Sequence, residues 1–449
     1  MIKIGIECHV QLNTKSKIFC NCSTKTAEEP NINTCEVCLG QSGSKPRLNF
    51  EALKQAIKVA LALNCKIAKE TFFSRKVYFY PDLPKNFQIT QHELPLASEG
   101  SFNNIRIRRV HMEEDPGKLI HEPNFCLIDY NRSGIPLIEI VTEPDFKSQE
   151  EVRDFLNKLV TTLEYLGVYF RESESSLRTD ANISLNNGER VEIKNITGAK
   201  DTETALRYEI ERQKKEKAVR ETRGWDAEQQ ITYSLRKKET EEDYGYITEP
   251  SLTKIEIDKE LIEKIKKEIP ELAHEKIQKF IKQYKLEKVD AEIIASDLLM
   301  AELFEKVAKQ INPILAAKWI RRELLRVLNY NKKQLRETEI KERHLVDLLN
   351  LIENKKITER TGQRIIEKLV EKPFDVKEYI EKEGLIAVSD KNELTKYCEE
   401  AIKENAKAVG DYKKGEEKAL NFVVGAVMKK SKGKATPKEV NEILKKLIK

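Results

Sequence analysis

The sequence predicts an α+β N-terminal domain with a mixed or antiparallel sheet, followed by an all-α helical domain and a small all-α tail domain. Apolar and polar residues alternate in several segments before residue 257, which is the pattern of half-buried strands. From Lys259 onward the apolar residues recur at helical spacing, with breaks at proline and asparagine. At 449 residues the chain exceeds one ordinary core, and we expect domains at residues 1–257, 258–372 and 373–449.

The composition indicates a highly charged cytoplasmic protein. Charged residues make up 35% of the chain, and no apolar run approaches the roughly 20 residues of a membrane span. The first residues begin a strand and lack the apolar core of a signal peptide, so we expect no export and no membrane partner. Eight cysteines are few for this length, which argues against a disulfide framework.

The first strand, residues 2–12, alternates strictly between apolar and polar side chains. Glu7, His9 and Gln11 therefore share one face, in steps of about 6–7 Å. A glutamate and a histidine at that spacing can bind one metal ion or phosphate. When this strand is considered alone, an ordinary solvent-facing surface is the simpler interpretation. The choice between a binding site and a plain surface therefore depends on other segments of the chain.

Four cysteines follow within nineteen residues: Cys20, Cys22, Cys35 and Cys38. Two close pairs separated by a short loop supply four thiolates for a tetrahedral zinc ion. A site closed by four sulfur ligands has no open coordination position. We therefore expect zinc to fold the loop 20–38 and to take no part in chemistry.

Two helices carry N-cap signals. Residues 49–64 repeat apolar positions at helical spacing behind Asn49, whose side chain is suited to an N-cap. Ser148 opens a second amphipathic helix that extends to about residue 166, with a glutamate three residues later as in a capping box.

Residues 75–91 predict two strands joined by a proline-bounded turn. Pro81 and Pro84 restrict the backbone of the turn and orient Lys85. An exposed lysine with no specific role explains Lys85 equally simply at this point.

The segment 109–145 is the centre of the predicted site. Glu113, Glu114 and Asp115 are expected where a strand opens into a loop, although dense acidic groups are usually just solvated surface. Glu139 interrupts the next apolar strand, and a carboxylate there is costly unless it is paired or binds a cation. This segment therefore predicts the floor of a cation site.

A hairpin follows around 186–188, and its register can be argued from the apolar face. A three-residue loop with Gly188 in the left-handed conformation pairs Ile183 with Val191 and keeps one face apolar. A two-residue turn would place a charged residue opposite Ile183. The chosen register sets Asp180 opposite Lys194, which makes Asp180 a second candidate for the polar site.

The C-terminal end is basic. Residues 405–449 contain 12 lysines and 5 acidic residues, whereas the whole chain carries a net charge of only +5. This asymmetry favours a nucleic-acid partner over a simple solubility tail. The lysines expected to approach phosphates are Lys429, Lys430, Lys432 and Lys434.

Several motifs together resemble one family, the B subunit of the aspartyl-tRNA(Asn)/glutamyl-tRNA(Gln) amidotransferase. The resemblance covers nearly the whole chain, and no segment is long enough for the synthetase-like insertion of the related E subunit. The matching motifs are residues 6–12, the four cysteines, and residues 78–85, 112–118, 129–145, 178–182 and 423–435. Residues 194–198 depart from the family pattern, so 196–200 are assigned no family role.

The resemblance implies a cradle-shaped N-terminal domain, a helical domain and a tRNA-binding tail. It implies a ligase that phosphorylates the side-chain carboxylate of misacylated Asp-tRNA(Asn) or Glu-tRNA(Gln) with ATP, after which ammonia displaces phosphate. The implied assembly is a heterotrimer with an amidase A subunit, which releases the ammonia, and a small C subunit. The implied cofactors are ATP, Mg²⁺ or Mn²⁺, and structural Zn²⁺.

The resemblance also implies roles for individual residues. The cation would be held by Glu7, His9, Glu113 and Glu114, with His9 and Glu113 as the leading direct ligands. The triphosphate would be bound by Lys85, Lys118 and Arg132. Asp180 would orient ammonium or support the ligands.

Two other functions stay open at this point. A non-catalytic, zinc-containing scaffold that binds tRNA would use the same cysteines and lysines, and its carboxylates would be structural. A stand-alone metal-dependent kinase is disfavoured because the chain has no Walker A or dinucleotide-binding motif. If ATP is bound, another kind of site binds it.

Overall fold

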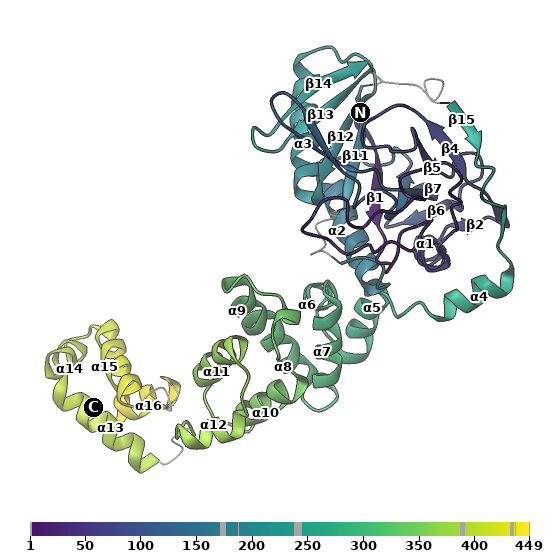
Figure 1. The fold of residues 1–449 in the computed structure, drawn as a ribbon. Helices are drawn as coiled ribbons and strands as arrows, with labels where there is room; N and C mark the ends of the chain where they lie inside the picture. The colour runs from purple at the N-terminus through teal and green to yellow at the C-terminus, as the bar shows by residue number, and fades with distance from the viewer. Residues whose placement is uncertain are drawn as a thin grey trace. The chain divides into compact units, whose positions relative to one another are not determined.

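The computed structural model describes residues 2–170, 177–186, 188–237, 245–386, 391–431, 435 and 437–448 (Figure 1). The chain divides into two compact units, Met1–Leu272 and Ala273–Lys449. The first unit is built on a large sheet with few helices, and the second is helical. The predicted fold class is therefore confirmed. The three predicted domain ranges stay a prediction.

The main sheet of the first unit has twelve strands among the described residues. Neighbouring strands pair antiparallel except β12 and β13, so the sheet is mixed. In spatial order the main path is β14 (Ile231–Lys237), β13 (Glu221–Asp226), β12 (Val191–Thr197), β11 (Arg178–Leu185), β1 (Ile2–Gln11), β10 (Pro136–Thr142), β7 (Ile105–Glu114), β5 (Phe87–Thr90), β4 (Ser74–Val77) and β15 (Gly245–Thr248). Off this path, β6 (Ala97–Phe102) pairs with β7 and with β2 (Lys66–Ile67).

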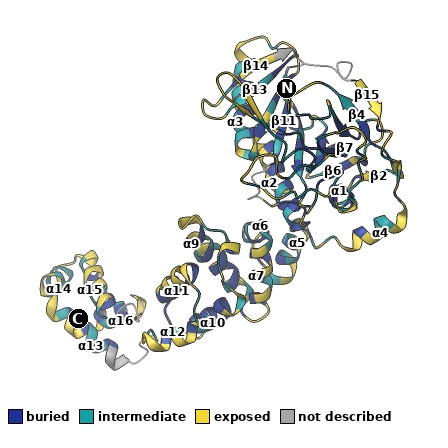
Figure 2. Cartoon of the chain, viewed as in Figure 1, coloured by how far each residue is buried: buried dark blue, intermediate teal, exposed yellow. Residues whose placement is uncertain are grey.

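The two faces of the sheet differ in character. On β1 the predicted alternation holds, because Ile4, Ile6, Cys8 and Val10 are all buried. Three helices pack on this unit: α1 (Phe50–Ala62), α2 (Gln149–Tyr165) and α3 (Gly198–Lys215). Figure 2 shows buried residues concentrated along the strands and exposed residues on the outer surfaces of the helices.

Aromatic contacts join α2 to the chain that surrounds it. The ring of Phe155 on α2 meets Phe146 edge to face at 5.2 Å between centroids and Phe102 of β6 at 5.5 Å. Phe155 is fully buried. Such T-shaped pairs add to the stabilisation from burial alone.

Both predicted N-caps are confirmed. The side chain of Asn49 accepts hydrogen bonds from the backbone of Glu51 and Ala52 at the start of α1. Ser148 accepts from the backbone of Glu151 at the start of α2. The Glu151 carboxylate in turn accepts from the backbone N–H of Lys147, which completes a close variant of the capping box.

The hairpin of β11 and β12 has the predicted register, with Ile183 opposite Val191. The expectation of a left-handed Gly188 is wrong. Of the loop residues that the structure describes, Asn186 is left-handed, with φ 51°, and the N–H of Gly188 donates to the carbonyl of Leu185 at 2.7 Å. Asparagine tolerates this conformation better than most residues because its short polar side chain bonds locally. Asn187 lies outside the described residues.

Two short ribbons and one helix complete the first unit. One ribbon pairs β8 (Lys118–His121) with β9 (Cys126–Asp129), and the other pairs β3 (Glu70–Thr71) with β16 (Ile255–Glu256). Helix α4 (Lys259–Lys267) begins at the residue where the sequence predicts the change from strands to helices.

The second unit contains only helical elements among its described residues. Its first group comprises α5 (Ala273–Tyr284), α6 (Lys288–Ala295), α7 (Leu298–Ala308), α8 (Pro313–Trp319), a π-helix at Ile320–Leu324, α9 (Leu325–Tyr330), a 3-10 turn at Leu335–Glu337, α10 (Glu342–Glu353), α11 (Glu359–Glu371) and α12 (Val376–Lys382). The tail comprises α13 (Lys391–Glu404), α14 (Ala406–Lys413), α15 (Glu417–Lys430) and α16 (Pro437–Ile448).

The tail helices share their own apolar core. Cys398 on α13, Val423 and Val427 on α15, and Leu444 on α16 are all fully buried in one cluster. Within the described ranges, each helix is too short or too polar to cross a bilayer.

The packing of Phe155 predicts a specific loss of stability. Replacing Phe155 by Ala should lower the free energy of unfolding of the first unit by about 3–5 kcal/mol, because the substitution leaves a cavity between two edge-to-face rings. Phe125→Ala is the matched control, since Phe125 is 60% exposed and should change the value by only about 0.5 kcal/mol. Urea titration followed by Trp225 fluorescence in a Trp319→Phe background measures both. A change of similar size in the two variants would contradict this account of the core.

Candidate functional site

Strand pairing gathers polar residues on one face of the main sheet. β10 lies between β1 and β7, and its Glu139 is directly opposite His9 on one side and His111 on the other. One step along the strands, Leu137 is opposite Gln11 and Glu113. Directly paired residues project to the same face. Three strands that are far apart in sequence therefore contribute to one polar surface.

The centre of this face is a set of three ligand-type side chains, His9, Glu113 and Glu139. The His9 Nε2 atom lies 3.6 Å from Glu113 Oε1 and 3.5 Å from Glu139 Oε2. One potential ligand atom from each residue lies within 4.8 Å of the other two. An imidazole nitrogen and two carboxylate oxygens suit Mg²⁺ or Mn²⁺. We call this set the cation cluster.

The charges of the cation cluster are mutually dependent. Burial alone lowers the pKa of His9, but its hydrogen bond to Glu139 and the charges of Glu139 and Glu113 outweigh burial and raise the pKa to about 9. Burial opposes ionisation of Glu139, yet His111 and His9 hold the pKa of Glu139 well below its usual range. Burial and the charge of Glu139 raise the pKa of Glu113. A bound cation would stabilise the ionised carboxylates in place of the charge that the two histidines supply.

Glu139 and His111 were absent from the predicted ligand set. Glu139 had a clear signal as a carboxylate within an apolar strand. The signal for His111 was its position two residues before Glu113, which places both on one strand face. The Nε2 atom of His111 lies 3.3 Å from Glu139 Oε2, and its buried Nδ1 has no hydrogen-bond partner among the described residues. This arrangement suits a tautomer that donates from Nε2 to Glu139.

Glu7 belongs to a second acidic set with Asp180 and Glu192. The ammonium of Lys194 lies 2.8 Å from Asp180 and 3.3 Å from Glu192, so this set already contains a cation from the chain itself. Burial and the neighbouring charges of Glu139 and Asp180 raise the pKa of Glu7. Asp180 and Lys194 form an ion pair, as the predicted register implied, although the register of the two strands shifts between Thr179 and Ala181. Glu7 therefore lies next to the cation cluster along β1 but is not part of it.

Glu114 faces Lys85, away from the cation cluster. The Lys85 ammonium lies 2.5 Å from Glu114 Oε2, and the backbone N–H of Ile89 donates to Glu114 Oε1 at 2.8 Å. Both carboxylate oxygens are therefore engaged. The structure brings Glu114 together with a predicted triphosphate ligand and separates it from its predicted metal partners, because adjacent strand residues project to opposite faces.

Asp115 organises the loop after β7. Its carboxylate is fully buried and lies 2.6 Å from an Arg178 nitrogen and 3.4 Å from Arg132, and it also accepts a hydrogen bond from Gln11. Arg132 further donates to the carbonyls of Pro116 and Gly117, at 3.1 and 2.9 Å. Arg132 is thus bound to the loop itself.

Lys118, the remaining predicted triphosphate ligand, is exposed on β8 in the separate ribbon. Of the predicted tail lysines, Lys429 is exposed on α15, whereas Lys430 forms ion pairs with Glu400 at 2.9 Å and Glu404 at 2.7 Å. Lys432 and Lys434 lie outside the described residues.

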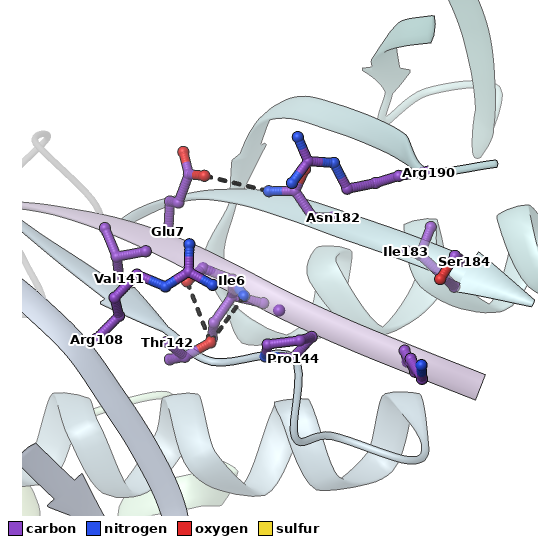
Figure 3. Close-up of a pocket in the computed structure, with 12 residues that line it drawn as sticks. Ile6, Glu7, Arg108, Val141, Thr142, Pro144, Asn182, Ile183, Ser184 and Arg190 are labelled. Carbon is purple, nitrogen blue, oxygen red and sulfur yellow. Dashed lines mark hydrogen bonds between the residues drawn. The ribbon is translucent and has the colours of Figure 1, made fainter. Parts of the chain in front are cut away.

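A cavity of about 170 Å³ opens beside Glu7, at the end of β10. The side chain of Asn182 donates a hydrogen bond to Glu7 Oε1 at 3.2 Å. Figure 3 shows this bond, with the guanidinium groups of Arg108 and Arg190 nearby. Thr142 at the floor bonds the backbone of Ile6. The lining combines apolar residues with three basic side chains, Lys3, Arg108 and Arg190, and one acidic side chain, Glu7. Arg108 is already paired with Glu143, so Lys3 and Arg190 are the groups that suit an anionic part of a substrate.

The four predicted cysteines meet in space. The four sulfur atoms all lie within 4.8 Å of one another; they belong to Cys20, Cys22, Cys35 and Cys38. The buried ammonium of Lys17 lies 3.7 Å from Cys38 Sγ. The hydrogen bond from Cys20, together with the charge of Lys17, lowers the pKa of Cys38 to about 5. Four converging sulfurs, one already favoured as a thiolate, fit a structural zinc ion.

Comparison with known proteins identifies relatives along the full chain. Residues 2–263 match the GatB/GatE catalytic domain, and residues 302–448 match the GatB domain. The B subunit of the aspartyl/glutamyl-tRNA(Asn/Gln) amidotransferase from Methanothermobacter thermautotrophicus is 45% identical over 455 residues, which cover 100% of both chains. The proteins of the same name from Methanobrevibacter smithii and Thermotoga maritima are 44% and 42% identical, and each alignment covers 99% of this chain and 99% or 98% of the relative.

The cysteine cluster generates a prediction about metal content. The purified chain should hold about one zinc ion, and Cys22→Ser should lose most of it because three sulfurs leave the tetrahedral site incomplete. Cys126→Ser is the control, since Cys126 is exposed on β9 outside the cluster. Elemental analysis of the dialysed proteins measures the zinc. Equal zinc in the wild type and Cys22→Ser would refute the site.

Proposed function

Because this chain belongs to the family of the B subunits of the aspartyl/glutamyl-tRNA(Asn/Gln) amidotransferases, we propose that it catalyses the ATP-dependent transamidation of misacylated Asp-tRNA(Asn) or Glu-tRNA(Gln). The observation that supports this most directly is the convergence of His9, Glu113 and Glu139 on one position of the polar sheet face. A site of this kind binds a divalent cation, and phosphoryl transfer relies on such a cation.

The chemistry requires activation of the substrate carboxylate. Ammonia cannot displace oxide from a carboxylate at neutral pH. In the proposed first step, an oxygen of the side-chain carboxylate bonds to the γ-phosphorus of ATP, and the bond to the bridging oxygen breaks with its electron pair leaving on ADP. In the second step ammonia bonds to the acyl carbon, inorganic phosphate leaves, and the amide forms after loss of a proton.

His9, Glu113 and Glu139 would hold the divalent cation, for which Mg²⁺ or Mn²⁺ fits the mixed nitrogen and oxygen donors. The cation would neutralise charge on the phosphates when bound. His111 would keep the Glu139 carboxylate oriented toward the cation by donating from Nε2.

The proposed roles of the remaining predicted residues follow from their contacts in the structure. Asp180 already accepts a hydrogen bond from the ammonium of Lys194, and we assign it the orientation of ammonium near Glu7. Lys85 and Arg132, predicted to bind the triphosphate, pair with Glu114 at the end of β7 and with Asp115 in the loop that follows, and we propose that they act through these carboxylates. The exposed Lys118 would reach the triphosphate directly.

The relatives are named as subunits of an amidotransferase, so we propose that this chain also works in a multi-subunit complex. An amidase A subunit would release ammonia from glutamine, and a small C subunit would complete a cytoplasmic heterotrimer. The basic tail would bind the tRNA body through its phosphates.

Replacing Glu113 by Ala tests the activity. The variant should lose at least about 100-fold in the rate of ATP cleavage that depends on misacylated tRNA, because a cation ligand is removed, while glutamine hydrolysis by the assembled complex persists. Glu99→Ala is the control, because Glu99 is exposed and its only ion pair within the described part of the chain is with Lys66 on β2. ADP release and amide formation are measured with each misacylated tRNA.

Normal amide formation by Glu113→Ala would refute the cation site. A wild-type complex that binds tRNA without consuming ATP would instead favour the non-catalytic scaffold. Cleavage of ATP by the chain without partner subunits would favour a stand-alone kinase.

The tail generates a second prediction. Combined replacement of Lys429, Lys432 and Lys434 by Ala should lower the slope of log affinity for tRNA against log salt by about 0.7–0.9 for each phosphate that is no longer neutralised. Lys430→Ala should change the slope less, because its ammonium already pairs with Glu400 and Glu404. Filter binding across salt concentrations measures both, and an unchanged slope in the triple variant would exclude this surface.

A further inference from the structure

Arg109 on β7 occupies a position beside the cation cluster. It lies directly opposite Val141 of β10, and the next pair on the same face of these two strands is His111 with Glu139. Directly paired residues share a face, and successive residues on one face are about 6–7 Å apart. Arg109 therefore projects from the polar face one strand step from the carboxylate of Glu139.

The neighbouring arginines of β7 are bound to carboxylates. Arg106 is paired with Asp145 through two nitrogens, at 2.9 and 2.6 Å, and Arg108 is paired with Glu143 through two contacts of 2.9 Å. A register shift near Arg108 leaves that residue without a direct partner on β10. The strand thus presents two arginines whose charges are neutralised within the chain.

Arg109 differs from both. Among the residues that the structure describes, none bonds to its buried Nε atom and none forms an ion pair with its guanidinium. The nearest carboxylate by register, Glu139, is shared by His9 and His111. A partly buried guanidinium with an unpaired donor is unfavourable unless a ligand supplies the missing acceptors.

We propose that Arg109 binds the phosphate group that is transferred, a role that deepens the proposed function and rests on it. A guanidinium presents two parallel donors that match two oxygens of a phosphate. A phosphate between Arg109 and a cation held by His9, Glu113 and Glu139 would meet positive charge on two sides. In the transfer, Arg109 donates hydrogen bonds to non-bridging oxygens of the γ-phosphate and gives up no proton.

The same position is less suited to the other anion of the reaction, the substrate carboxylate. That group carries one charge and must approach the γ-phosphorus from the side opposite the leaving oxygen. The phosphate carries more charge and remains at the site through both steps, first on ATP and then on the acyl phosphate. The two anions can be distinguished by kinetics. If Arg109 binds the phosphate, its substitution raises the KM for ATP, and if it binds the substrate carboxylate, its substitution raises the KM for misacylated tRNA.

The test compares Arg109→Met and Arg109→Lys with Arg106→Gln in the complete complex. Arg109→Met should raise the KM for ATP about tenfold and lower kcat for tRNA-dependent ADP formation by about 100-fold, as for other donors to a transition-state oxyanion. Arg109→Lys should recover part of kcat because it retains the charge but loses the two-pronged geometry. Arg106→Gln should behave as the wild type, since Arg106 is 69% exposed on its side chain and pairs with Asp145.

A second measurement separates phosphate binding from a structural role. Binding of Mn²⁺ to the nucleotide-free chain, followed by electron paramagnetic resonance, should be unchanged in Arg109→Met because arginine is not a ligand. Lost Mn²⁺ binding, a normal KM and kcat, or a raised KM for misacylated tRNA alone would each overturn the assignment. A wild-type complex that forms no ADP with misacylated tRNA would instead remove the proposed function and this inference with it.

Discussion

The position of β10 between β1 and β7 is the constraint on which the site depends. Antiparallel pairing on both sides aligns His9, Glu139 and His111 in one row and Gln11, Leu137 and Glu113 in the next. A shift of either pairing by one residue would turn the polar side chains toward the apolar core and the apolar ones toward solvent. The buried residues Ile138 and Ile140 of β10 oppose such a shift. The hydrophobic effect therefore determines the geometry of a polar site.

The distribution of charge on this face separates structural carboxylates from those available to ligands. Glu114 is held by Lys85, Asp115 by Arg178, and Asp180 by Lys194. The carboxylates of the cation cluster lie within 3.3–3.6 Å of histidine nitrogens, and a histidine can release its proton when a metal ion binds. Arg109 is the counterpart, a positive group whose buried Nε has no partner among the described residues. We therefore propose that this face binds one cation and one anion.

The cavity beside Glu7 extends this surface away from the cation cluster. Its walls come from β1, β11 and the end of β10, so they are held by the same strand pairing. The zinc-type cysteine cluster serves a different purpose. Through Lys17, whose ammonium contacts Cys38 and the carbonyls of Asn33 and Tyr130, it ties its loop to the segment that follows β9. We propose that this loop supports the chain around the site.

Much of the architecture could be predicted from local patterns. Alternation predicted β1, cap residues predicted the starts of α1 and α2, cysteine spacing predicted a converging cluster, and an apolar face predicted the register of the hairpin at Ile183 and Val191. These features depend on residues close in sequence or on a single repeating period. The left-handed residue was misplaced at Gly188 because a tight loop can place that conformation at more than one of its residues.

The sequence by itself determined the fold class, the family resemblance and the kinds of group that the polar face contains. Only the tertiary structure decided which of them meet. Glu7 and Glu114 looked equivalent to Glu113 along the chain, yet pairing places Glu7 with Asp180 and Glu192, and strand alternation turns Glu114 toward Lys85. In the same way, the local sequence could not show which of the β7 arginines is paired with a carboxylate, because Arg106, Arg108 and Arg109 look alike along the chain. Which charge remains available to a ligand depends on cross-strand neighbours, and those neighbours are many residues away in sequence.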